Sequence, residues 1–178
     1  MLSAPQTTVT ITTIRALPAD DSARHHALAL LHDHPAMIRL GPLMQRYERI
    51  PPSSPAETSN AYIITDKLPY LPFGLWTGEL SIYAEFVDTE EGLVTKVRAP
   101  GGFVSEGVWK VKEEGGERWA VEERMVARCP WGMGWYVEGT TRKAHEAVLG
   151  RFVAEVRARM EGKDGEGKAK VDGVEGKC

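Results

Sequence analysis

The sequence predicts a single α+β domain in which a curved antiparallel sheet of seven strands wraps around one long C-terminal helix. Three observations lead to this fold class. Residues 45–129 hold six closely spaced segments whose apolar residues recur at every second position, which is the period of a half-buried strand. A further β-branched segment precedes them at 8–16, and the only long amphipathic segment left to cover the sheet lies at 140–160.

The N-terminal region predicts one strand and one or two short helices. Residues 8–16 (TVTITTIRA) are β-branched and alternate in polarity, as a strand does. Helix-start residues follow at Pro18 and 20–22, and an apolar stripe then runs to Leu31. Pro35 is expected to end this helix, and the stretch MIRLGPLM is expected to form a second short helical piece.

The central region predicts six more strands, at QRYERI, AYIITDKL, LWTGELSIYAEFV, GLVTKVRA, VSEGVWKVK and RWAVEERMVARC. The evident turns between them, SSPAETS, DTEEG and EEGGE, are short. Short links join antiparallel neighbours, so we expect mostly a meander. Alternation places one apolar set on a face that must be covered: Trp76, Leu80, Ile82, Ala84 and Phe86.

The covering element is the helix expected from Thr140 to Met160, with a threonine as its N-cap and Gly162 as its stop. At 100° per residue, four side chains form the centre of its apolar stripe: His145, Leu149, Phe152 and Val156. We expect one domain over residues 5–161. The segment 162–178 is rich in glycine and mixed charge and has almost nothing to bury, so a disordered tail is expected there.

Composition and charge exclude several classes of partner. The 178 residues carry 22 Lys+Arg against 25 Asp+Glu, a net charge of -3, with no basic run, so no nucleic acid partner is expected. No apolar run is long enough for a membrane span, so we expect no stable membrane insertion and a cytoplasmic location. Cys129 and Cys178 form neither a disulfide framework nor a metal pair.

Neither a metal nor a cofactor is expected. The histidines at 25, 26, 32 and 34 do not share one helix face, and no cysteine lies nearby. The glycines of APGGF and PWGMGW lack the spacing of a phosphate loop or a dinucleotide fingerprint. They are better interpreted as hairpin turns.

The order of a strand, short helices, six antiparallel strands and a long C-terminal helix resembles the helix-grip fold of the START-like superfamily. That superfamily includes the birch-pollen allergen family, lipid-transfer domains and polyketide cyclase/dehydratase-like proteins. The stretches LLHDHPAMIRLGPLMQRYE, YIITDKLPYLPFGLWTGELSIYAEFVDTEEGLVTKVRAPGG and TTRKAHEAVLGRFVAEV also resemble a fungal family of unknown function within it. The resemblance covers about residues 5 to 160.

This resemblance implies a deep cavity between sheet and helix that holds an apolar or amphipathic ligand. The large inward residues are then candidates for its lining, although several can simply fill the core: Trp76, Phe86, Trp109, Trp119, Phe152 and Val156. Loops commonly border the opening in this superfamily, so Phe103, Trp131 and Trp135 are candidates for an apolar rim. His34, before Pro35 at the helix end, is placed at the cavity mouth.

Two residues are candidates for chemistry. His145 lies inside the apolar stripe, where a histidine is either hydrogen-bonded to a neighbour or serves as a polar anchor or acid/base group facing the cavity. Alternation in RWAVEERMVARC places Glu123 among apolar neighbours. In the fold that the resemblance implies, this last strand lies close to the start of the C-terminal helix, so Glu123 is expected within reach of His145. A Glu–His pair could move a proton in an enolisation or dehydration, or it could be a buried salt bridge.

Three classes of function remain. The first is a binding protein that takes up a hydrophobic small molecule, such as a lipid, a polyketide or another secondary metabolite. The alternative is an enzyme of the cyclase, dehydratase or isomerase kind that uses His145 and Glu123. The third is a protein-interaction module that uses the tryptophan rim. Fold alone does not choose among them.

Overall fold

The computed structural model describes residues 5–52, 60–69, 77–116 and 118–162. Seven strands form one antiparallel sheet in the order β1-β7-β6-β5-β4-β3-β2. The strands are β1 (Gln6–Ala16), β2 (Met44–Ile50), β3 (Asn60–Pro69), β4 (Thr77–Thr89), β5 (Gly92–Ala99), β6 (Phe103–Glu113) and β7 (Trp119–Pro130). The helices are α1 (Ala23–Leu31), α2 (His34–Arg39) and α3 (Gly134–Met160), and a short 3-10 turn, η2 (Pro100–Gly102), joins β5 to β6. The predicted helix-grip architecture is confirmed.

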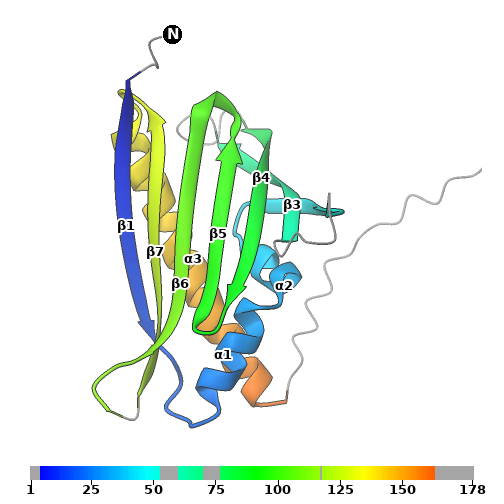
Figure 1. Ribbon diagram of the computed structural model, residues 1–178, viewed down its shortest axis with the longest axis vertical. Coiled ribbons are helices and arrows are strands. Elements are labelled where there is room, and N and C mark those ends of the chain that lie inside the picture. Colours follow the sequence, from blue (N-terminus) through cyan, green and yellow to red (C-terminus); the bar gives the residue numbers. More distant parts are fainter. Residues whose placement is uncertain (1–4, 53–59, 70–76, 117, 163–178) are drawn as a thin grey trace, which may run out of the picture.

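Strands β2 to β7 form a meander, and the first strand, β1, is added at its β7 edge. Strands β2 to β7 pair with their neighbours in sequence, whereas β1 pairs with β7, with Val9 opposite Ala127 and Ile11 opposite Met125. The sheet curves, and α3 runs along its inner face (Figure 1). Glu123 therefore lies on the second strand from the β1 edge of the sheet, facing the helix.

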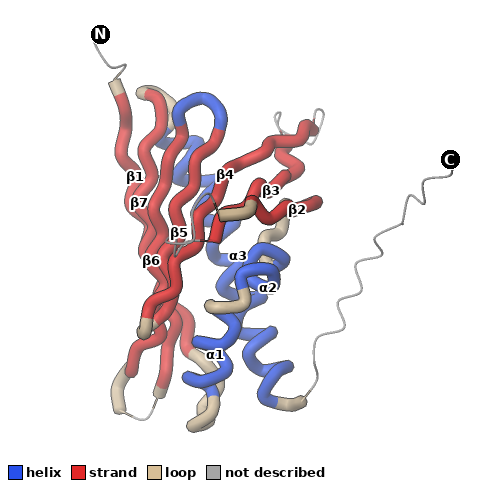
Figure 2. Tube along the Cα trace, turned by 45° about the vertical axis from the view of Figure 1, so that its right-hand side comes forward, coloured by secondary structure: helices blue, strands red, loops and turns tan. Residues whose placement is uncertain are grey.

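The closed core lies at the end of the molecule where α1 packs against the C-terminal part of α3 (Figure 2). The side chains here are fully buried because α1 fills the space between α3 and the sheet. They come from α1, from α3 and from the inner faces of β5 and β7: Ala23, Ala27, Leu30, Leu31, Leu93, Val121, Leu149, Phe152 and Val156.

The helix α3 begins six residues earlier than the sequence predicts. Its N-cap is Met133, and Thr140 is internal, with its hydroxyl donating to the carbonyl of Tyr136 at 2.8 Å. A glycine starts the helix because a Cβ at Gly134 would lie 2.7 Å from the Thr7 methyl on β1. At the other end Gly162 takes the left-handed conformation (φ 70°), in agreement with its predicted role as the stop.

The second helix also lies elsewhere than expected. It spans His34–Arg39 rather than MIRLGPLM, and Pro35 sits in its first turn instead of merely ending α1. The Asp33 side chain caps it by accepting the N–H of Ala36 at 3.1 Å. Met44, the last residue of the predicted helical stretch, already belongs to β2.

Some predictions fall outside the described residues: the lining role of Trp76, the turn SSPAETS, and the segment 163–178 with Cys178. Within the described part of the chain, none of the helices combines the length and the apolar character needed to cross a bilayer.

Candidate functional site

Glu123 and His145 meet between the sheet and α3. The carboxylate projects from the inner face of β7 and is 3% exposed, and the imidazole projects from α3 and is 24% exposed. His145 Nδ1 lies 2.6 Å from Glu123 Oε1. The two elements that the sequence analysis expected to approach one another therefore bring an acid and an imidazole into contact.

The contact is electrostatic rather than a well-aligned hydrogen bond. Although the atoms are close, neither His145 Nδ1 nor Glu123 Oε2 has a hydrogen-bond partner among the described residues, and both atoms are buried. A buried polar atom without a partner costs stability unless a ligand or a water completes it. The pair is thus incompletely satisfied by the protein alone.

Two further polar groups lie near the carboxylate, and one of them, the Thr95 hydroxyl, was not predicted from the sequence. A Cβ placed on Gly107 of β6 would lie 2.6 Å from Thr95 Oγ1, 3.8 Å from Glu123 Oε1 and 3.8 Å from Trp109 Nε1. The absence of a side chain at Gly107 therefore lets these polar groups converge over the strand. The Thr95 hydroxyl also donates to the Gly107 carbonyl at 3.4 Å.

The inner face beyond this polar cluster is apolar but incompletely covered. Leu80 and Ile82 of β4, Val97 of β5 and Val148 of α3 are half-buried, and all but Leu80 pack against the edge of the main core. This half of the interior differs from the end next to α1, where the equivalent side chains are fully buried. The sheet thus carries a closed half and a more open half.

Four of the predicted lining residues belong to the packed interior. Phe86 and Trp109 are buried, and Phe152 and Val156 are fully buried. The Trp109 and Phe152 rings lie 6.1 Å apart. These rings and side chains fill the core because α1, whose position under α3 the sequence did not reveal, occupies the space that was expected to stay open. Trp109 lies at the border of this core, since its Nε1 is 3.8 Å from the point that a Cβ on Gly107 would occupy, beside the polar cluster.

Trp119 is half-buried at the start of β7 and lies beneath the guanidinium of Arg24, which is 5.3 Å from its ring. This cation–π contact holds α1 against β7. Trp119 is the first residue of β7, two positions before Val121. It lies at the α1 end of the strand, away from His145.

His34 differs from its expected place at an open mouth. Its side chain is 5% exposed, Nε2 contacts Asp88 Oδ1 at 2.8 Å, and the ring lies 5.1 Å from that of Phe86. The Asp88 carboxylate accounts for the burial, because it gives the imidazole a partner. His34 thus fastens α2 to the end of β4.

The expected rim divides into two parts. Trp131 and Trp135 are 75% and 78% exposed, and they form an apolar surface at the start of α3 together with Met133 and Tyr136. Phe103, in contrast, is half-buried and packs against Val9, Ile11, Met125 and Ala127. Phe103 therefore belongs to a small second core between β1, β6 and β7.

A second acid on the inner face was also missed. Asp66 of β3 shares a face with the core residues Tyr62 and Ile64, and burial raises the pKa of its carboxyl above the usual 3.8. Its position could have been found from alternation, because AYIITDKL places the aspartate in phase with Tyr62. It stands opposite Leu80 of β4.

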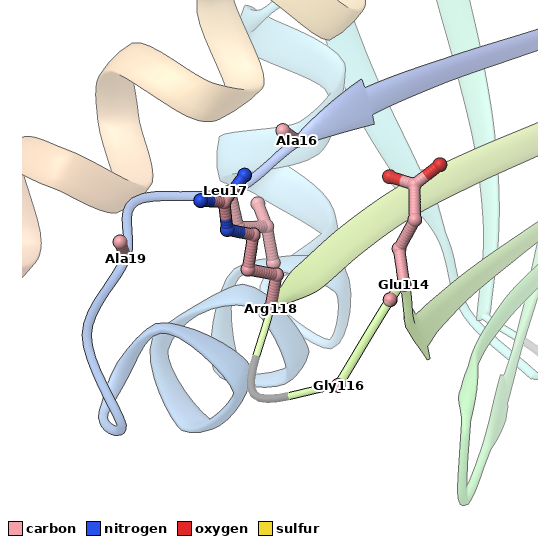
Figure 3. A pocket seen from close by; sticks show the side chains of 7 residues that line it. Ala16, Leu17, Ala19, Glu114, Gly116 and Arg118 are labelled. Carbon is pink, nitrogen blue, oxygen red and sulfur yellow. The ribbon is translucent and has the colours of Figure 1, made fainter.

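A hollow of about 600 Å³ lies near Trp119 at the start of β7, and neither Glu123 nor His145 lines it. Figure 3 shows it between the β1–α1 connection and the β6–β7 hairpin, lined by Ala16, Leu17, Ala19, Glu114, Gly115, Gly116 and Arg118. It is open to solvent and holds no predicted site residue. We therefore attach no chemistry to it.

The remaining histidines have local roles. His32 Nε2 lies within 3.1 Å of the carbonyls of Thr89 and Gly92 and so holds the β4–β5 turn against α1. The rings of His25 and His26 stand edge to face, 5.7 Å apart. Over residues 5–52, 60–69, 77–116 and 118–162, no three His, Cys, Asp or Glu side chains gather as metal ligands would.

Comparison with known families identifies the chain's relatives. Residues 6–158 match the family described as a domain of unknown function (DUF7053). The chain belongs to this family. No curated protein sequence matches the chain significantly.

Solved structures share the fold of this family member at low identity. TTHA0849 from Thermus thermophilus is 16% identical, with 85% of this chain and 99% of that chain covered and a TM-score of 0.59. The di-domain ARO/CYC BexL from the BE-7585A biosynthetic pathway is 15% identical, with 85% and 51% covered and a TM-score of 0.61. Ara h 8.0201 is 10% identical, with 83% and 99% covered and a TM-score of 0.51. These likenesses place the chain in the START-like and birch-pollen-allergen-like fold.

Proposed function

We propose that this domain, residues 5–161, binds a hydrophobic small molecule between the inner face of the sheet and the N-terminal half of α3. The observation that carries the proposal is the half-buried apolar surface of Leu80, Ile82, Val97 and Val148, which faces inward and which α3 leaves partly uncovered. Burying such a surface against an apolar ligand is favourable in proportion to the area removed from water.

The polar cluster beside this surface supports the same proposal. Ligand sites are mostly apolar, with a few polar groups that fix orientation. Glu123, His145 and Thr95 provide such groups, and one carboxylate oxygen of Glu123 has no partner among the residues that the structure describes. The fold is also that of an ARO/CYC protein from a biosynthetic pathway, BexL, which is consistent with a lipid, a polyketide or another secondary metabolite as the ligand.

A pair of matched substitutions tests the binding site. Ile82 and Ile63 are both half-buried on neighbouring strands, but Ile82 faces the interior and Ile63 the outer side of the sheet. We expect I82Q to weaken the binding of the neutral probe N-phenyl-1-naphthylamine at least tenfold, as measured by fluorescence titration of the full chain. The control I63Q should bind as the wild type does.

Native mass spectrometry of the freshly purified protein complements the titration. A co-purified apolar molecule that is lost in I82Q and kept in I63Q would support the proposal. A wild-type protein that binds neither a co-purified molecule nor the probe would contradict it.

The second candidate function is an enzyme that uses Glu123 and His145 for acid/base catalysis. The 2.6 Å contact of a buried carboxylate with an imidazole favours it, because such a pair can hold a proton in transit. The step would be an enolisation, in which Glu123 takes a proton from the carbon next to a carbonyl and the same proton, or one from solvent passed through His145, returns to carbon.

Exchange with deuterium separates binding from catalysis. With 2-tetralone in D₂O, an enzyme should speed the replacement of the α-protons above the buffer rate, followed by proton NMR. H145L and E123Q should then lose the acceleration while still binding N-phenyl-1-naphthylamine. An exchange rate equal to that of buffer alone would leave binding as the function.

A further inference from the structure

The polar cluster formed by Glu123, His145, Thr95 and Trp109 contains hydrogen-bond donors and acceptors that can select among hydrophobic ligands. The acceptor is Glu123, whose Oε1 faces His145 and whose Oε2 is buried without a partner among the described residues. A ligand group that donates a hydrogen to Oε2 would complete this carboxylate. A ligand group with no hydrogen to give would leave it unsatisfied and dehydrated.

The donor is the indole of Trp109, the cross-strand neighbour of Glu123. Trp109 Nε1 and Glu123 Oε1 each lie 3.8 Å from the point that a Cβ on Gly107 would occupy, so both atoms lie near the same glycine. Within the described part of the chain, the indole N–H donates to no other residue. An indole nitrogen can only donate, so its natural partner is an oxygen acceptor.

Apart from the His145 imidazole that contacts Glu123, no basic side chain faces this donor and acceptor in the described part of the chain. The strands β4 to β7 place no lysine or arginine on their inner faces in the described residues. Arg151 of α3 donates to the Leu40 carbonyl at 3.2 Å, and Arg159 is paired with Asp33 and Glu155. A second inward acid, Asp66 of β3, lies opposite Leu80 on the same face of the sheet.

These observations disfavour an anionic ligand. A carboxylate placed next to Glu123 would meet a second carboxylate in a poorly hydrated setting, with no lysine or arginine among the described inward residues to balance it, and contacts between like charges are unfavourable. A hydroxyl group has the opposite properties. It can donate to the Glu123 carboxylate and at the same time accept from Trp109 Nε1.

Building on the proposed binding function, we infer that the ligand is an uncharged molecule with a phenol, enol or alcohol hydroxyl, which Glu123 and Trp109 hold together. The site therefore discriminates against fatty acids and other apolar carboxylates. In this arrangement Gly107 acts as a specificity determinant, because any side chain there would occupy the space over which the two groups converge.

Three probes of nearly equal size test the inference at pH 7: 2-naphthol, 2-methoxynaphthalene and 2-naphthoate. The first has a hydroxyl donor, the second only an acceptor, and the third is an anion. In fluorescence titrations of the full chain we expect 2-naphthol to bind about tenfold more tightly than 2-methoxynaphthalene and 2-naphthoate to bind weakest.

Variants connect this order of affinities to the named residues. E123Q should reduce the preference for 2-naphthol and strengthen binding of 2-naphthoate, because the charge is gone while the shape is kept. W109F retains an aromatic ring but loses the N–H, so it should also weaken 2-naphthol relative to 2-methoxynaphthalene. The matched control is E122Q, since Glu122 is the next residue on β7, faces outward and pairs with Lys112. It should leave all three affinities unchanged.

The outcomes separate this inference from the proposed function. Equal affinities for the three probes, or a preference for 2-naphthol that survives in both E123Q and W109F, would overturn the inference while leaving apolar binding intact. If the wild-type protein binds none of the three, nor N-phenyl-1-naphthylamine, both the inference and the proposed function fail.

Discussion

At the scale of single residues, Gly107 of β6 determines how closely the inner faces of β5, β6 and β7 pack. Gly107 has Thr95 on one neighbouring strand and Met125 on the other. The threonine hydroxyl occupies the space that a Cβ would need. Since protein interiors are close-packed, even a methyl group in such a place forces its neighbours to move.

The substitution G107A should therefore destabilise the protein by about 1–3 kcal/mol, the usual cost of overpacking a core. Urea unfolding followed by circular dichroism measures this change. The double variant G107A/T95A removes the hydroxyl that the new methyl group meets and should recover part of the loss. A single variant as stable as the wild type would contradict the packing described for Gly107.

At the scale of elements, one ion-pair cluster joins the α1–α2 junction to the end of α3. Arg159 donates to Asp33 at 2.9 Å and to Glu155 at 3.1 Å, and Asp33 also caps α2. Burial raises the pKa of the Asp33 carboxyl, but the hydrogen bonds from Arg159 and from the Ala36 N–H, with the nearby arginine charges, outweigh it. The resulting pKa lies below 3.8.

This lowered pKa predicts a dependence of stability on pH. A carboxyl with a folded-state pKa below its unfolded value contributes stability above the unfolded pKa and loses it as the pH falls through the folded pKa. At pH 7 we expect D33N, which keeps a capping oxygen, to lose about 0.5–1 kcal/mol, since the Asp33 side chain is 38% exposed and partly screened. That loss should disappear when the pH falls well below 3.8.

The variant D33A removes the cap as well as the charge, so a further loss of about 1 kcal/mol is expected at pH 7. Unlike the charge effect, this second part should persist at acid pH, where a protonated Asp33 can still accept a hydrogen bond. Urea unfolding of both variants at pH 7 and pH 3 measures the two contributions. Equal losses for D33N at the two pH values would show that the ion pair contributes nothing.

At the scale of the whole molecule, the interior is divided between a closed half and a more open half. Leu30 of α1 is fully buried in the closed half, whereas Val148 of α3 is half-buried on the side of the proposed site. We expect L30A to cost about 2–5 kcal/mol, as fully buried leucines do. V148A should cost clearly less, about 1 kcal/mol, because fewer neighbours surround it.

Thermal unfolding with and without N-phenyl-1-naphthylamine distinguishes the two halves further. The probe should still raise the melting temperature of L30A, because the proposed site is intact in that variant. In V148A the stabilisation by the probe should be smaller, since its binding surface is altered. A loss of the probe effect in L30A alone would contradict the division.

The fold was predictable from the sequence because strand periodicity is repeated across six closely spaced segments and a single long amphipathic helix remains to cover them. The contact of Glu123 with His145 followed from alternation and helix periodicity, together with the place of the last strand beside the C-terminal helix in the fold that the sequence resembles. The position of α1 under α3 could not be predicted in this way. An apolar stripe such as the one that ends at Leu31 shows that a helix packs against something, but it does not identify the element against which the helix packs. The early start of α3 was hidden by Gly134 and Gly139, since glycine ordinarily disfavours a helix interior.

The pairing of β1 with β7 has a consequence for how the chain acquires its structure. These neighbours are separated by more than 100 residues of sequence, with Ile11 opposite Met125, so β1 cannot form its hydrogen bonds until β7 has been synthesised and has folded back onto it. Folds dominated by such distant pairings form slowly. Until then β1 exposes a row of unpaired backbone groups, which favour pairing with other chains.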